Sequence, residues 1–206
     1  MSDKIIISFD IGIKNLAVCV LHVIDNTAEI LIWKIIKLAA EKEKIPVMNE
    51  LTGRLFLELD GLVDELDGKK VDTVLLENQP SRLNGSMKSL QMIIYSYFQL
   101  RKHWEGFVQQ VLLVSASEKL KGHSEDKYPT IEPATQTLTS KQKKAQGYKN
   151  NKNMSVHITK EYIKEDSELY KEFCSYKKAD DYGDSFLQCI SWIHKHGYNI
   201  NKVYRV

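Results

Sequence analysis

The sequence predicts an α/β fold with one mixed β-sheet, an antiparallel meander followed by parallel strands, flanked by helices. A β-branched apolar run opens the chain at 4–9, and short turns separate it from apolar runs at 16–21 and 30–36, which is typical of a meander. Leucines then recur at helical spacing between 47 and 66. Because that helix leads into another buried strand at 71–77, the connection is a crossover and implies parallel pairing.

The second half continues the pattern and then departs from it. Its predicted elements are a loop at 81–86, an aromatic-rich helix at 87–103, a fifth strand at 107–114, and helical segments around 154–163, 169–173 and 178–193. Between about 117 and 152 the apolar periodicity disappears, and proline, serine, threonine, glutamine and lysine dominate. We interpret this stretch as a mobile basic insertion in a single domain spanning 1–206.

Composition indicates an ordinary globular protein. The chain has 206 residues, of which 43% are hydrophobic and 27% charged, with a net charge of +2. It has no run long enough to span a membrane and no signal or transit segment at its start, so we expect an intracellular protein. The three cysteines show no metal or disulfide spacing, which fits a reducing compartment. The sequence also contains no P-loop and no dinucleotide fingerprint, so no nucleotide cofactor is expected.

Two carboxylates occupy equivalent places in the predicted sheet. Asp10 ends the first buried strand and Glu77 ends the strand after the crossover. If the two strands are parallel neighbours, both acids emerge at the same carboxyl edge, where open α/β sheets build their sites. An acid at the end of such a run is costly to desolvate unless a cation or hydrogen-bond donors meet it. A turn-capping role for Asp10, helped by Gly12, is the simpler alternative.

Further acids open the last helix. Asp180 has the ordinary role of an acid in a first helical turn, whereas Asp184 follows Asp181 by three residues and shares its helix face. If Asp10, Glu77, Asp181 and Asp184 converge, their mutual repulsion requires cations. Hard oxygen ligands select Mg²⁺ or Mn²⁺, and two such ions can activate water for phosphodiester hydrolysis.

Three separated blocks give the chain a specific resemblance. They are Phe9 to Leu16, then Glu77 to Ser81 together with Asn84 to Gln91, and finally Lys178 to Ser185. In this order they resemble the RuvC-type Holliday junction resolvases of the RNase H-like superfamily, most closely the branch of poxviruses and other large DNA viruses. The resemblance implies a five-stranded RNase H-like sheet and paired symmetric nicks in four-way DNA junctions by a homodimer. It also implies a host-cytoplasmic location if the protein is virus-encoded.

Carried over position by position, the catalytic and metal-binding acids of these resolvases fall on Asp10, Glu77, Asp181 and Asp184, with Asp180 as the alternative to Asp181. Two Mg²⁺ or Mn²⁺ ions per active site are implied. The aromatic helix is a candidate for the dimer interface or the junction surface. Four lysines are candidate phosphate ligands for four-way and other branched DNA: Lys14, Lys88, Lys149 and Lys152.

Other functions stay open at this stage. An actin-like or sugar-kinase-like ATPase also opens with a strand ending in Asp-x-Gly, but needs two such domains. A catalytically silent junction-binding scaffold has no reason to keep four mutually repelling acids. A related nuclease that cuts other branched DNA or RNA–DNA hybrids is the alternative that the sequence separates least well.

Overall fold

The computed structural model describes residues 3–80, 85–120 and 139–205. Twelve elements follow one another along these ranges: β1 (Asp3–Asp10), β2 (Leu16–Ile24), β3 (Thr27–Ile36), α1 (Met48–Asp64), β4 (Val71–Glu77), α2 (Gly85–Glu105), β5 (Val108–Val114), the 3₁₀ turn η1 (Glu118–Leu120), α3 (Ser140–Tyr162), α4 (Glu168–Ser175), α5 (Ala179–Lys195) and β6 (Val203–Arg205).

One sheet holds all six of these strands in the order β5-β4-β1-β2-β3-β6. The strands β1, β2 and β3 form the predicted antiparallel meander, and β4 and β5 continue the sheet in parallel on the other side of β1. The mixed sheet flanked by helices is therefore confirmed. The predicted count of five strands is wrong, because the short β6 pairs in parallel with β3. Three residues are too few for an alternating pattern to be recognised in the sequence.

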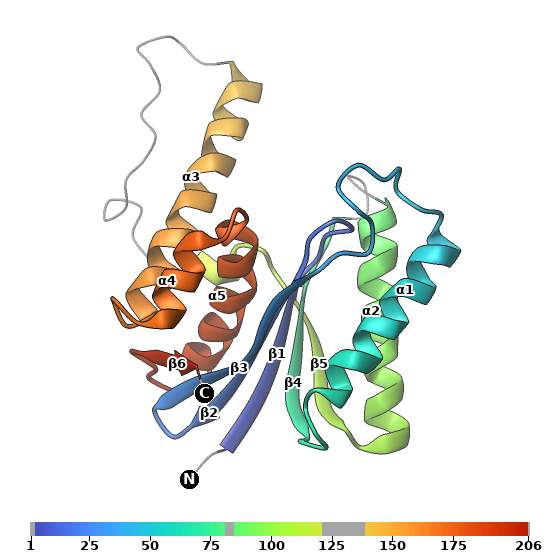
Figure 1. The fold of residues 1–206 in the computed structure, drawn as a ribbon, viewed down its shortest axis with the longest axis horizontal. Coiled ribbons are helices and arrows are strands. Elements are labelled where there is room, and N and C mark those ends of the chain that lie inside the picture. Colours follow the sequence, from blue (N-terminus) through green and yellow to red (C-terminus); the bar gives the residue numbers. More distant parts are fainter. Residues whose placement is uncertain (1–2, 81–84, 121–138, 206) are drawn as a thin grey trace.

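Helices cover both faces of the sheet (Figure 1). The helices α1 and α2 pack on one face, and α3, α4 and α5 cover the other. Side chains of β1 alternate between these two cores: Ile5, Ile7 and Phe9 belong to the α1/α2 side, whereas Ile6 faces α5. This alternation decides which face receives each residue at the end of a strand.

The helix α3 begins well before the apolar spacing that predicted it. It starts at Ser140, where Thr139 and Gln142 form a reciprocal capping box. Its N-terminal half extends past the end of the sheet (Figure 1). The part of the predicted insertion from 140 to 152 is therefore helical, while 121–138 lie outside the described residues. Among the described residues, no helix is long and apolar enough to cross a bilayer.

Candidate active site

Strand register places Asp10 and Glu77 side by side. The strands β1 and β4 run parallel, and their last paired residues are Phe9 and Leu76, so each acid is the next residue along. Leu76 faces the α1/α2 core and Leu75 faces α5, and by alternation Glu77 also points toward α5. Asp10 likewise lies on the same face as Ile6. The buried strands thus deliver both carboxylates to one edge and one face.

The turn after Asp10 depends on a glycine. A Cβ at Gly12 would lie only 2.5 Å from the carbonyl oxygen of Asn15, so any other residue would collide with the backbone of the turn. Beyond the turn, the amide of Leu38 donates a hydrogen bond to the carbonyl of Ile13 at 3.2 Å. Gly12 therefore allows the tight turn of the backbone that follows Asp10.

The helix α5 supplies the third acid, Asp184. Its apolar stripe packs on the sheet through Phe186, Leu187 and Ile190. Two polar contacts fix its first turns: the indole of Trp33 on β3 donates to the carbonyl of Tyr182 at 3.0 Å, and the Gln188 amide donates to the carbonyl of Phe9 at 3.4 Å. These contacts hold the N-terminal end of α5 over the carboxyl ends of β1 and β4.

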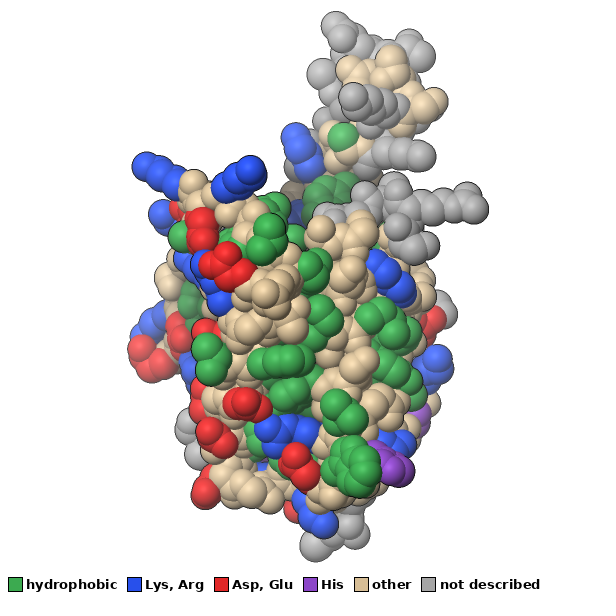
Figure 2. Space-filling model, turned by 90° about the vertical axis from the view of Figure 1, so that its right-hand side faces the viewer, with side chains coloured by type: hydrophobic (Ala, Val, Ile, Leu, Met, Phe, Trp, Pro, Cys, Tyr) green, Lys and Arg blue, Asp and Glu red, His purple; other side chains and the backbone are tan. Residues whose placement is uncertain are grey.

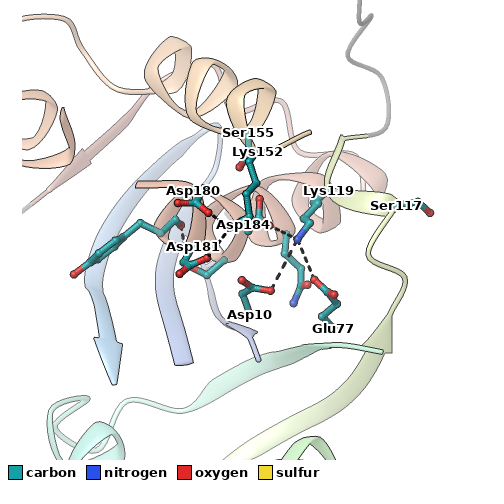
Figure 3. Close-up of polar contacts among 12 residues, drawn as sticks. Asp10, Glu77, Ser117, Lys119, Lys152, Ser155, Asp180, Asp181 and Asp184 are labelled. Atoms are coloured by element: carbon teal, nitrogen blue, oxygen red, sulfur yellow. Dashed lines mark hydrogen bonds and ion pairs between the residues drawn. The ribbon is translucent and has the colours of Figure 1, made fainter. Parts of the chain in front are cut away.

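Lys119 lies at the centre of the three acids (Figure 3). Its ammonium is 2.5 Å from Asp184 Oδ2, 3.0 Å from Glu77 Oε2 and 3.9 Å from Asp10 Oδ1. This lysine was not among the site residues predicted from the sequence. It belongs to η1, which follows β5, and because β5 is parallel to β4 its end reaches the same sheet edge. That topology is the signal that could have identified it.

Charge is unevenly balanced in this group. Burial raises the pKa of Asp10 well above its usual range, and Asp184 and Glu77 add to the shift, although Lys119 opposes it. The three carboxylates raise the pKa of Lys119 despite its own desolvation. Among the residues that the structure describes, a single ammonium therefore faces three acids, and this group has more negative than positive charge.

A second charged group lies one helical turn away on α5. Lys152 of α3 pairs with Asp180, and its ammonium is 3.6 Å from Asp181 Oδ1. Desolvation and the neighbouring Asp180 raise the pKa of Asp181. In Asp180 the opposing effect of Lys152 outweighs desolvation and lowers the pKa. The structure thus brings Asp10, Glu77 and Asp184 together around Lys119, whereas Asp181 lies beside Lys152.

The two helices that carry these groups cross at a very close contact. Gly183 on α5 faces Ser155 and Thr159 on α3, and an added Cβ would lie 2.9 Å from Ser155 Oγ and 3.0 Å from Thr159 Oγ1. Ser155 is fully buried, and its hydroxyl has no hydrogen-bond partner in the part of the chain that the structure describes. Lys152 precedes Ser155 by three residues, as Asp180 precedes Gly183. The crossing therefore sets the spacing of the Lys152 and Asp180 pair.

Both charged groups open into one cleft of about 360 Å³. Among its lining residues are Asp10, Glu77, Lys119, Asp181 and Asp184. Within the described ranges, no three acidic, histidine or cysteine side chains are close enough together to hold a metal as they stand. The chemistry of the donors still fits a hard divalent cation, since the Lys119 ammonium is surrounded by carboxylate oxygens of Asp10, Glu77 and Asp184.

The four lysines predicted to contact DNA lie in different surroundings. Lys14 lines the cleft and donates to the carbonyl of Glu41 at 2.6 Å, and Lys152 also lines it. Lys88 donates to the side chains of Asn78 and Gln91. Lys149 is exposed on the projecting half of α3. Their contacts with DNA stay predictions.

The family of the chain follows from its sequence. Residues 4–124 match the family model described as "Poxvirus A22 protein", and this match covers more than half of the chain. The chain belongs to this family. A relative from Acanthamoeba polyphaga mimivirus, the uncharacterized protein L451, is 28% identical over 143 residues. Those residues are 68% of this chain but only 33% of the relative, so the chain spans about a third of that protein's length.

Solved structures share the fold at low sequence identity. The fowlpox virus Holliday junction resolvase is 18% identical with a TM-score of 0.57, over 93% of this chain and 99% of that one. The yeast mitochondrial Holliday junction resolvase Ydc2 is 20% identical with a TM-score of 0.57, over 94% and 83%. Thermus thermophilus RuvC in complex with a Holliday junction substrate is 13% identical with a TM-score of 0.51, over 95% and 98%. The resemblance noted in the sequence and the RNase H-like fold are thereby confirmed.

Gly183→Ala is expected to lower the free energy of unfolding by about 1–3 kcal/mol, because its methyl group overpacks the contact between α3 and α5. Urea denaturation measures this change. Adding Ser155→Ala removes the nearest atom and should recover part of the loss, while Ser155→Ala alone serves as the control. A Gly183→Ala protein as stable as the wild type would show that the contact tolerates a side chain.

Lys119→Met is expected to destabilise the protein in EDTA by up to about 3–5 kcal/mol, because it leaves three acids without their shared cation. Millimolar Mg²⁺ should then stabilise the variant more than the wild type, as the ion restores the missing charge. Melting curves with and without Mg²⁺ measure both effects. Lys195→Met, which removes an exposed lysine 3.5 Å from Glu118, is the matched control and should change little. Equal melting curves for the two variants would contradict this assignment.

Proposed function

We propose that this protein is a metal-dependent, structure-selective endodeoxyribonuclease that resolves four-way DNA junctions by paired symmetric nicks. The observation that carries the proposal is the meeting of Asp10, Glu77 and Asp184 around Lys119 at one sheet edge. Its support from comparison is the shared fold with proteins named as Holliday junction resolvases. All four acids of the predicted catalytic set line the same cleft, which favours an enzyme over a silent scaffold.

Asp10, Glu77 and Asp184 are the proposed ligands for Mg²⁺ or Mn²⁺, and Asp181 is the fourth acid of the set. Two such ions would make a bound water nucleophilic at neutral pH and would stabilise the leaving oxygen of the phosphodiester. The chain's own part is to hold the oxygens on rigid strand and helix ends, which keeps the catalytic geometry precise. Because Asp10 is buried, the attraction between its carboxylate and a bound cation would be weakened less by solvent than at the surface.

Lys119 is a candidate for a role beyond balancing charge. Its side chain is only 12% exposed, and its ammonium is already at the point where the three acids meet. With cations bound at the acids, the Lys119 ammonium would be free to turn toward a substrate phosphate in the cleft and to stabilise its negative charge. Moving the ammonium from the acids to the phosphate needs only a rotation of the flexible Lys119 side chain.

Two cuts in symmetry-related strands call for two equivalent active sites, so we propose a two-fold homodimer. The face covered by α1 and α2 is the candidate interface. Hydrophobic side chains gather in the middle of this face, and charged side chains lie mainly around them (Figure 2). Its exposed apolar residues on the two helices are Phe56, Leu57, Met92, Leu100 and Trp104.

The named viral relatives fit the prediction that the protein acts in the host cytoplasm.

Asp10→Asn and Glu77→Gln are each expected to reduce junction cleavage by at least about 100-fold, because each removes a charged metal ligand. Both variants should still bind the junction in a mobility-shift assay, since phosphate contacts are unchanged. Asp64→Asn, an exposed acid on α1, is the matched control and should cut normally. Cleavage by both active-site variants at the wild-type rate would refute the proposed function.

Lys149→Ala is expected to weaken junction binding and to reduce the slope of log affinity against log salt by about 1, because it removes one exposed phosphate contact. Binding titrations at salt concentrations between about 50 and 200 mM measure the change in this slope. An unaltered slope would place Lys149 outside the DNA surface. Lys171→Ala on α4, whose lysine pairs with Glu168 in solvent, is the control.

A further inference from the structure

Tyr148 has a position that core packing does not explain. It lies on the half of α3 that projects past the sheet, and 64% of the residue is exposed to solvent. Its side chain nevertheless lines the cleft that holds Asp10, Glu77 and Asp184. An aromatic ring beside a group of acids gains little from burial of apolar surface. A role in binding is the better account of this placement.

A charged side chain of the same helix contacts the ring of Tyr148. The ammonium of Lys152 lies 5.1 Å from the centre of the Tyr148 ring, which is within cation–π range. Lys152 is in turn paired with Asp180 and lies 3.6 Å from Asp181. These two acids belong to α5, whose distance from α3 is fixed at Gly183. Through Lys152 the ring is thus connected to the helix that carries Asp184.

The position of the Tyr148 ring beside the acids limits which groups of a bound nucleic acid it can contact. If the scissile phosphate lies at the acids, the nearest flat apolar group that a nucleic acid presents is the base of an adjoining nucleotide. Bases stack on exposed aromatic side chains, whatever their sequence. In continuous duplex both faces of each base are covered by neighbours, so a protein ring can stack only where the stack opens. A branch point provides such an opening.

We propose that Tyr148 stacks against a nucleobase exposed next to the scissile phosphate, and so contributes to the preference for branched DNA over continuous duplex. This inference rests on the proposed function, because it takes its geometry from a phosphate bound at the acids. The phenol hydroxyl takes no part, and Lys152 acts as the positioning residue for the ring. The site would take any of the four bases.

Fluorescence of 2-aminopurine tests the inference without requiring cleavage. The base analogue is placed in turn at the nucleotides flanking the branch point of a synthetic junction, and binding is followed with Ca²⁺ in place of Mg²⁺. We compare wild-type protein with Tyr148→Leu, which keeps an apolar side chain without a ring, and with Tyr148→Phe, which keeps the ring. Tyr204→Ala, a half-exposed tyrosine on β6, is the control. Melting curves verify that each variant is folded.

The expected result is quenching at one position by wild type, Tyr148→Phe and Tyr204→Ala, and its loss in Tyr148→Leu. Junction affinity of Tyr148→Leu should fall by about fivefold or more, while affinity for linear duplex changes by less than about twofold. Equal quenching and affinity for Tyr148→Leu and wild type would overturn the inference, as would a wild-type protein that binds no junction. Wild-type cleavage of the same junction in Mg²⁺ is measured in parallel. A wild type that binds and quenches through Tyr148 without cutting would retain the stacking of Tyr148 on a base at the branch point and refute the nuclease.

Discussion

Repulsion among carboxylates at one edge of the sheet is the constraint to which the rest of the site is fitted. Two unit charges about 4 Å apart repel by about 4 kcal/mol at an effective dielectric near 20. The fold places three acids there from three separate elements, β1, β4 and α5, and meets them with one ammonium from η1. Burial raises the pKa of Asp10, and the charges of Asp184 and Glu77 add to the shift although Lys119 opposes it. A group with this imbalance has an intrinsic affinity for further positive charge.

The same balance of charge extends along α5 and onto α3. Asp180 and Asp181 begin α5, and Lys152 neutralises part of their charge from the facing helix. That pairing is possible because Gly183 lets the two helices approach within side-chain contact of Ser155 and Thr159. A glycine inside a helix costs up to about 1 kcal/mol relative to alanine, and here the close crossing accounts for it. Packing between helices thus fixes the positions of polar groups in the cleft.

Much of this arrangement could be predicted from the sequence. Asp10 and Glu77 end continuous apolar strands, and the crossover between them requires parallel pairing, so their proximity followed from topology. Asp184 followed from its place on an amphipathic helix. Lys119 was missed because it follows β5 in a short turn without periodicity, and only the parallel pairing of β5 with β4 could have pointed to it. Its role depends on which strand neighbours β4, which local spacing does not reveal.

Other differences have equally local causes. The start of α3 at Ser140 was missed because residues 140–153 lack an apolar stripe, and the helix begins with a capping box instead. The pairing of Lys152 with Asp180 joins residues 28 positions apart, so no helical spacing could indicate it. As a result Lys152, which the sequence offered as a free phosphate ligand, is partly engaged by acids in the structure. Contacts between elements, rather than the elements themselves, were the part that sequence patterns left undetermined.

The central claim is that the acids at this sheet edge form a metal-dependent site for cutting branched DNA. The most direct measurement is to map the products of wild-type protein on a synthetic four-way junction, a linear duplex and an RNA–DNA hybrid, each with Mg²⁺, Mn²⁺ or EDTA. The account predicts paired symmetric nicks near the branch point of the junction, only when a divalent metal is present. Cleavage confined to the hybrid, or nicks of the junction that persist in EDTA, would contradict it.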